Sequence, residues 1–169
     1  MMGLYYEEAE IGQKWQLGSY HFTREAVLRF ARAYDPQVFH IDDQAAAESH
    51  FGRLAASGWH TASAWMRCYV EADDAARKAR IARGDVLPEH GPSPGITNLK
   101  WIKPVYPGDT ITYWMEIIGK REMASRPRWG LATKHSEGFN QNGELVFAFD
   151  GKVMVQRKSA LQPELRPES

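Results

Sequence analysis

The chain has 169 residues, in which 21 lysines and arginines balance 21 aspartates and glutamates. This length suits one domain with a single core, and the balanced charge argues against nucleic acid or an anionic membrane as a partner. Cys68 is the only cysteine, which excludes an intramolecular disulfide, and no apolar run reaches the roughly 18 residues that a membrane span needs. We therefore expect a cytoplasmic protein with no membrane segment.

The N-terminal part of the chain predicts a strand followed by a short helix. Residues 14–22 are the strand, and Thr23 is a typical N-cap for the helix. The apolar face of this helix is expected at the i, i+3, i+4 and i+7 positions, which are Val27, Phe30, Ala31 and Tyr34. Pro36 ends the helix, because a residue before proline is pushed out of the α region. Asp35 is therefore expected just past the helix end, with a carboxylate that is free to point away.

The middle of the chain predicts a loop, a second short helix and one long helix. Residues 37–42 are expected to be extended or looped, and Asp42 or Asp43 caps the short helix. A helix of about 25 residues starts at Ser57. Its apolar face is expected at Trp59, Ala62, Met66, Tyr69 and Val70. The charged segment 71–83 is expected to project into solvent, and the proline-rich segment 84–95 to form a loop.

After residue 95 the apolar period changes from 3.6 to 2, which indicates strands. Four are predicted, at residues 96–105, 110–120, 131–139 and 145–156. Pro107 and Gly108 favour a type II turn, and the Asn142-Gly143 step favours a hairpin. The layout is an α+β fold, with a helix on one face of an antiparallel meander. We expect one domain over residues 1–158 and a flexible tail over residues 159–169.

Two segments, YDPQVFHID at residues 34–42 and FGRLAASGWHT at residues 51–61, resemble the MaoC-like dehydratase family of the hotdog superfamily. The resemblance covers roughly residues 12–157, and the turn VYPGDT near Pro107 also matches. Its most specific part is an aspartate and a histidine five positions apart, Asp35 and His40, followed by Asp42 and by the small residues Ala56, Ser57 and Gly58. It implies a hotdog fold, in which the sheet wraps around the long central helix.

The best characterised members of this family are (R)-specific enoyl-CoA hydratases, and the resemblance implies that Asp35 and His40 act as a dyad on water. The chain departs from those hydratases in two places. Residues 36–39 replace the Asn-Pro that usually separates the dyad, which leaves the substrate open. The segment 71–95 is long for the family and would shape a different substrate entrance.

Hydration of an enoyl thioester needs a base for the water, a proton for the α-carbon and a stabiliser for the thioester oxygen. Asp35 and His40 are the candidates for the first two tasks. The N–H groups at the start of the long helix, with the Ser57 hydroxyl, are the candidates for the third, and Gly58 lets a ligand approach the backbone closely. The alternatives are that Asp35 only turns the helix exit, that His40 is a satisfied semi-buried side chain, and that Ser57 is a plain N-cap.

Other motifs give no site. The sequence holds no HExxH, CxxC or GxGxxG pattern, so we expect neither a metal nor a bound cofactor. His50 and His60 are expected to be structural, and Cys68 to be packed in the core. The tryptophans Trp59, Trp65, Trp101 and Trp114 are expected in the core or in a dimer contact. Basic residues that might meet CoA phosphates, Arg53, Lys100 and Lys103, are isolated and are left unassigned.

The sequence thus predicts a hydro-lyase that reversibly hydrates a trans-2-enoyl-CoA thioester to a (R)-3-hydroxyacyl-CoA. A thioesterase is the alternative enzyme, since related hotdog folds hold a thioester at a helix N-terminus and use a carboxylate on water. A non-catalytic subunit that binds acyl thioesters is the alternative outside enzymes. Because strands with bare edges favour pairing between subunits, we also expect a homodimer.

Overall fold

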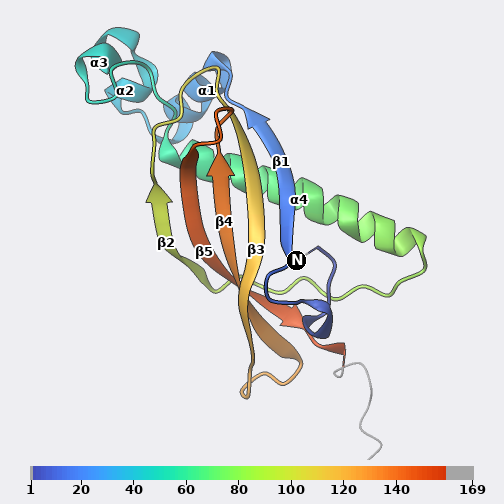
Figure 1. Ribbon diagram of the computed structural model, residues 1–169. Helices are drawn as coiled ribbons and strands as arrows, with labels where there is room; N and C mark the ends of the chain where they lie inside the picture. Colours follow the sequence, from blue (N-terminus) through green and yellow to red (C-terminus); the bar gives the residue numbers. More distant parts are fainter. Residues whose placement is uncertain (1, 159–169) are drawn as a thin grey trace, which may run out of the picture.

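The computed structural model describes residues 2–158 (Figure 1), and the predicted tail at 159–169 lies outside them. In chain order the elements are the 3-10 helix η1 (Tyr6–Glu8), β1 (Lys14–His21), α1 (Arg24–Tyr34), α2 (Val38–Ile41), α3 (Asp43–Glu48), α4 (Gly58–Ala82), β2 (Gly95–Trp101), β3 (Thr110–Glu122), β4 (Trp129–Phe139) and β5 (Leu145–Gln156). Among residues 2–158 we find no helix with both the length and the apolar character that crossing a bilayer requires.

Within residues 2–158 the strands form one five-stranded antiparallel sheet in the order β1-β3-β4-β5-β2, and α4 lies across one face of it (Figure 1). The predicted meander therefore holds only for β3, β4 and β5. After α4 the chain returns through the segment 84–95 to the far edge, where β2 pairs with β5. This helix-in-sheet arrangement is the hotdog fold, as predicted.

The turn chemistry read from the sequence is confirmed. Gly108 has φ 97°, and the Asp109 N–H donates to the Tyr106 carbonyl at 3.0 Å, as a type II turn requires. At the hairpin between β4 and β5, Gly143 has φ 76° and its N–H donates to the Asn140 carbonyl at 3.0 Å. The second turn joins β4 to β5 and sets their register, whereas the first leads the chain into β3.

Two local predictions are wrong. The segment expected to be extended or looped contains the helical turn α2, which the Asp42 N–H closes by donating to the Val38 carbonyl at 2.9 Å. The strand predicted over residues 96–105 ends at Trp101. Pro104 cannot donate to a sheet ladder, and the Val105 carbonyl instead accepts from the Ala56 N–H at 2.7 Å, which ties this segment to the start of α4.

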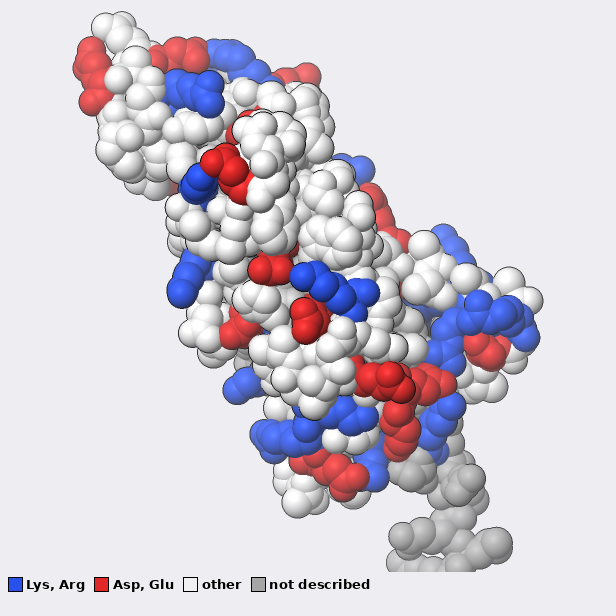
Figure 2. Space-filling model, in the orientation of Figure 1, with Lys and Arg blue, Asp and Glu red and all other residues white. Residues whose placement is uncertain are grey.

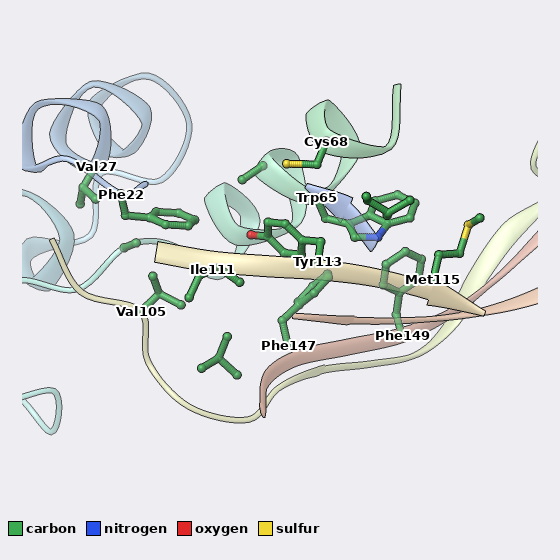
Figure 3. Packing of buried hydrophobic residues seen from close by; sticks show 14 of the residues in the cluster. Phe22, Val27, Trp65, Cys68, Val105, Ile111, Tyr113, Met115, Phe147 and Phe149 are labelled. Carbon is green, nitrogen blue, oxygen red and sulfur yellow. The ribbon is translucent and has the colours of Figure 1, made fainter. Parts of the chain in front are cut away.

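The apolar face predicted for α4 is also wrong. Trp59, Met66 and Val70 are each more than half exposed, whereas the buried face carries His60, Thr61, Ala64, Trp65 and Cys68. Apart from Trp65, this face carries small and polar side chains that let the helix lie close to the sheet, so apolar size alone does not identify the buried side. Figure 3 shows Trp65 and Cys68 facing the sheet residues below them. The buried packing expected for Cys68 is confirmed.

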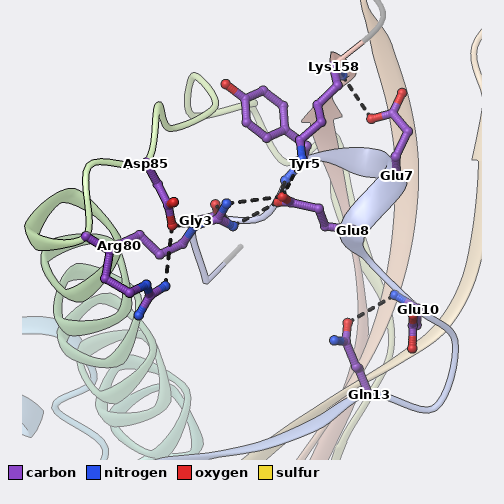
Figure 4. Close-up of polar contacts among 10 residues, drawn as sticks. Gly3, Tyr5, Glu7, Glu8, Glu10, Gln13, Arg80, Asp85 and Lys158 are labelled. Atoms are coloured by element: carbon purple, nitrogen blue, oxygen red, sulfur yellow. Dashed lines mark hydrogen bonds and ion pairs between the residues drawn. The ribbon is translucent and has the colours of Figure 1, made fainter.

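The second half of α4 does not simply project into solvent as predicted. Arg80 binds the N-terminal segment, because its guanidinium donates to both carboxylate oxygens of Glu8, at 2.8 and 3.1 Å, and to the Gly3 carbonyl at 2.8 Å (Figure 4). Its Nε also donates to Asp85 at 3.1 Å. The N-terminal segment is thus fixed to the C-terminal end of the helix.

Charged side chains are mixed on the face of the molecule that Figure 2 shows. Lysines and arginines alternate there with aspartates and glutamates, and no large area carries one sign. This agrees with the equal numbers of acidic and basic residues in the chain.

Candidate active site

Three separate elements bring Asp35, His40 and Ser57 together. Asp35 is the C-cap of α1, His40 lies in α2, and Ser57 is the N-cap of α4. The Asp35 N–H still donates to the Ala31 carbonyl at 2.8 Å, and Pro36 then turns the chain away from the helix. The carboxylate is therefore held by a helix end rather than by a mobile loop.

The Asp35 carboxylate is at the centre of this group. Its Oδ2 accepts a hydrogen bond of 2.7 Å from the Ser57 hydroxyl and lies 3.5 Å from His40 Nε2. Its Oδ1 accepts a hydrogen bond of 2.8 Å from the Gln37 amide. The Asp35 side chain is 16% exposed and that of His40 is 6% exposed.

Hydrogen bonds also affect the Asp35 pKa and determine the tautomer of His40. Burial opposes ionisation of Asp35, but the hydrogen bonds from Ser57 and Gln37 outweigh it and hold the carboxyl pKa below its ordinary value. His40 Nδ1 lies 2.8 Å from the Ala55 carbonyl, which can only accept, so Nδ1 carries a proton. In a neutral imidazole the lone pair of Nε2 then faces Asp35.

The start of α4 also borders this group. The Ser57 hydroxyl oxygen accepts from the Trp59 N–H at 3.2 Å while its proton is donated to Asp35. The N–H of Gly58 is at the first helical position, where no intrahelical acceptor exists. A Cβ on Gly58 would lie 2.5 Å from the Trp101 ring, so glycine is required here for the indole to pack against the helix start.

A cavity of about 450 Å³ connects these residues. The polar part of its wall includes Asp35, Gln37 and His40, and Gly58 forms another part. Its apolar wall comes from α2, the turn after α3, the start of α4, the end of β2 with the segment that follows it, and β5, and includes Phe39, Phe51, Trp59, Trp101, Ile102 and Val146. The site is therefore a mostly apolar cavity with a proton-carrying pair at one wall, as small-molecule sites commonly are.

Sequence reasoning missed two contributors to this wall. Gln37 follows Pro36 directly, but no pattern in the sequence indicates that its amide turns back two residues to Asp35. Trp101 was expected in the core or in a dimer contact; it is 46% exposed in the single chain, and its ring covers Gly58. Trp101 ends β2, and β2 lies next to β5. Its position at the start of α4 could therefore be predicted only once the strand order was known.

The two histidines expected to be structural differ in their surroundings. His60 is 5% exposed, stacks on Phe30 with ring centroids 4.6 Å apart, and has a pKa lowered to about 4 by burial and by Arg29. His50 is exposed and borders the cavity, packed against Phe51. In the described part of the chain no three His, Cys, Asp or Glu side chains are grouped closely enough to hold a metal ion.

The fold and this cavity define a hotdog domain with an aspartate and a histidine beside a helix N-terminus. The sequence model of the MaoC like domain matches residues 7–138, so the chain belongs to this family of MaoC-like dehydratases. A MaoC-like dehydratase of Rhodospirillum rubrum, whose structure has been solved, is 33% identical, with 92% of this chain and 98% of that chain covered and a TM-score of 0.77.

Two further relatives bear on function. The Bacillus subtilis protein named "Uncharacterized protein YdeM" is 27% identical over 155 residues, which cover 89% of this chain and 98% of that protein. The mesaconyl-CoA hydratase of Cereibacter sphaeroides is 33% identical over 73 residues, which cover 43% of this chain but 21% of that enzyme.

Proposed function

We propose that the protein is a hydro-lyase that reversibly hydrates a trans-2-enoyl thioester of CoA to a (R)-3-hydroxyacyl thioester. The observation that carries the proposal is the 3.5 Å separation of Asp35 Oδ2 and His40 Nε2 at the wall of a cavity that also contains the start of α4. The family, and the partial similarity to a mesaconyl-CoA hydratase, support a hydration reaction on a CoA thioester.

The dyad is suited to hold one water molecule. With Nδ1 of His40 protonated, both Nε2 and the ionised Asp35 present lone pairs, and a water molecule can donate one hydrogen bond to each. During hydration one O–H bond of the water breaks and its proton passes to the dyad, while the oxygen bonds to C3. The electron pair of the double bond moves towards the thioester oxygen, and C2 then takes the proton from the dyad, so that one water adds in total.

The thioester oxygen is best placed against the Gly58 N–H. This group is at the positive end of a helix of 25 residues and lacks an intrahelical partner. The Ser57 hydroxyl already donates its proton to Asp35, which supports a task for it other than the one expected from the sequence. We therefore assign Ser57 to positioning the carboxylate and Gly58 to the oxyanion.

The decisive experiment follows the loss of ultraviolet absorbance of a panel of trans-2-enoyl-CoA substrates. We expect Asp35→Asn and His40→Ala each to lower the hydration rate about 10²- to 10⁴-fold. The matched controls are Asp74→Asn and His21→Ala, which make the same changes at exposed positions on α4 and β1. Rates in the two dyad variants that equal those of the controls would refute the dyad.

A free-thiol assay in the same reactions separates the alternatives. Hydration consumes the double bond and leaves the thioester intact, whereas a thioesterase releases CoA. Thiol release that requires Asp35 would establish hydrolysis instead of hydration. Binding of acyl-CoA with turnover equal to that of buffer would establish a non-catalytic subunit.

We also propose that the protein acts as a homodimer that pairs through β2. This strand is an edge of the sheet, and most of its residues are exposed. It ends at Trp101, which borders the cavity, so a partner subunit on this edge would complete one wall of the candidate site.

A further inference from the structure

A second cavity, of about 200 Å³, lies beneath the loop at 84–95. Its walls come from the middle of α4, from that loop, from the start of β2, from the middle of β4 and from the second half of β5. Among the described residues none borders both this cavity and the candidate active site. The proposed hydration therefore does not account for it.

The loop that covers the cavity is firmly attached to β5. The Met154 N–H donates to the Pro92 carbonyl at 3.0 Å, the Glu89 N–H donates to the Gln156 side chain at 2.7 Å, and the Ser93 hydroxyl donates to the Lys152 carbonyl at 2.7 Å. A Cβ on Gly91 would lie 1.8 Å from the Met154 carbonyl oxygen, so glycine is required for this approach. The loop over the cavity is thus held in one position by its bonds to β5, while Met66 and Ile96 at the cavity remain half exposed.

Lys134 on β4 is buried in the wall of this cavity, with 6% of its surface exposed. Its ammonium lies 4.3 Å from the centre of the Tyr69 ring, and within residues 2–158 neither a hydrogen bond nor an ion pair joins Nζ to an acceptor. Burial lowers the Lys134 pKa to about 8, although Asp73 acts in the opposite direction. A buried ammonium without an acceptor is costly, so an anionic ligand would be favoured here.

The other charged groups at the cavity already have partners. On α4, Arg77 donates to the Pro88 carbonyl at 3.0 Å, and Asp73 lies 4.0 Å from His90 of the loop. Glu89, also of the loop, is paired with Arg128 at 3.1 Å. The residues of β2 and β5 that border the cavity carry no charge. Lys134 is therefore the group that decides which sign of charge a ligand of this cavity carries.

We propose that this cavity binds a small apolar carboxylic acid in its ionised form, with the carboxylate on the Lys134 ammonium. The hydrocarbon part would lie against Trp65, Met66, Phe149 and Val153. A cavity of about 150 Å³ holds benzene, so this one suits an acid of about six to eight carbons. The charge-assisted hydrogen bond from Nζ to the carboxylate then replaces the hydrogen bonds to water that the lysine loses on folding.

The test is calorimetric titration of the full-length protein with hexanoate, and with hexanamide as the uncharged isostere. We expect the wild type to bind hexanoate at least tenfold more tightly than hexanamide. Lys134→Met should weaken hexanoate binding at least tenfold, whereas Lys152→Met, on β5 with an exposed side chain, should not change it. Equal hexanoate affinity in Lys134→Met and the wild type, or no binding to the wild type, would overturn the proposal.

Two measurements on the wild type remain decisive if Lys134→Met does not fold. Affinity for hexanoate should fall about tenfold between pH 7 and pH 9, because Lys134 loses its proton at about pH 8 while the acid stays ionised. In lysine-labelled protein the Lys134 Nζ resonance should titrate at higher pH when hexanoate is bound. A titration midpoint that hexanoate does not move would show that Asp73 and Tyr69 alone satisfy this lysine.

Discussion

At the scale of single residues, the Asp35 carboxylate is held by two donors on opposite sides, the Ser57 hydroxyl and the Gln37 amide. Each bond favours the ionised form, and together they outweigh the effect of burial on the Asp35 pKa. This arrangement keeps a partly buried carboxylate charged beside His40. It also means that a residue with no contact to substrate can set the pH range of the reaction.

We predict that Ser57→Ala lowers hydration activity about 10- to 10²-fold and moves the acidic limb of its pH profile to higher pH. Loss of the hydroxyl removes a hydrogen bond that lowers the Asp35 pKa, so a larger fraction of the carboxyl is protonated at a given acidic pH. Loss of the N-cap also costs about 1 kcal/mol of stability. The measurement is kcat/KM against pH, together with thermal unfolding.

The matched control for this prediction is Ser63→Ala. Ser63 lies on the same helix, and its hydroxyl donates to the Trp59 carbonyl, not to Asp35. Ser63→Ala should leave the acidic limb of the kcat/KM profile at the wild-type pH. An acidic limb that is also unmoved in Ser57→Ala would show that the hydroxyl does not tune the carboxyl.

The Asp35, His40 and Ser57 group could be anticipated from the resemblance to MaoC-like dehydratases, and the proline after Asp35 and the serine before the long helix also mark helix ends. The distances between the three could not be, since each lies on a different helix. Gln37 and Trp101 escaped prediction for the same reason. Their contacts with Asp35 and Gly58 depend on how α1, α2, α4 and β2 meet in space.

At the scale of elements, α4 shows where sequence periodicity misleads. The long helix and its start were predicted within a residue, but the predicted buried face was Trp59, Ala62, Met66, Tyr69 and Val70, and three of these are more than half exposed. The face on the sheet is instead marked by Thr61, Ala64 and Cys68, because small residues permit close packing. The large side chains on the other face, such as Trp59 and Met66, remain exposed in the single chain.

We predict that Arg80→Gln destabilises the protein by about 1–2 kcal/mol near neutral pH, because it removes a two-pronged ion pair with Glu8 and a bond to the Gly3 carbonyl. Hydrogen bonds from Arg80, opposed by burial, lower the Glu8 pKa from 4.5 to about 2. The stabilisation is therefore complete above pH 4.5 and is lost as the pH falls towards 2. Chemical unfolding at several pH values measures it.

Arg83→Gln is the control for this prediction, since the Arg83 side chain is 65% exposed and, among residues 2–158, pairs only with Asp85, at 3.4 Å. It should change the free energy of unfolding by less than about 0.5 kcal/mol. A difference between Arg80→Gln and the wild type that persists unchanged at pH 2 would mean that Arg80 stabilises through packing and not through Glu8.

At the scale of the whole molecule, the sequence predicts the class of fold but not the order of its strands. Alternation and turn residues identify β3, β4 and β5 as neighbours, since short turns join them. The segment 84–95 is long enough to carry β2 to either edge, and nothing local selects the β5 side. The loop's bonds to β5, such as the His90–Val155 bridge, are tertiary contacts that have no period in the sequence.

The position of β2 at an edge gives the last prediction, which concerns assembly. We expect the wild type to sediment as a dimer, and Ile96→Lys to weaken dimerisation at least tenfold, because a lysine on an edge strand opposes pairing with another strand. Ile96 is 51% exposed.

The control is Ile118→Lys, which makes the same change at a residue 44% exposed on β3. This strand has a neighbour on each side, so the variant should leave the dimer intact. Analytical ultracentrifugation over a concentration series measures the dimer dissociation constants of the wild type and of both variants. A monomeric wild type, or equal weakening by the two variants, would exclude β2 as the dimer edge.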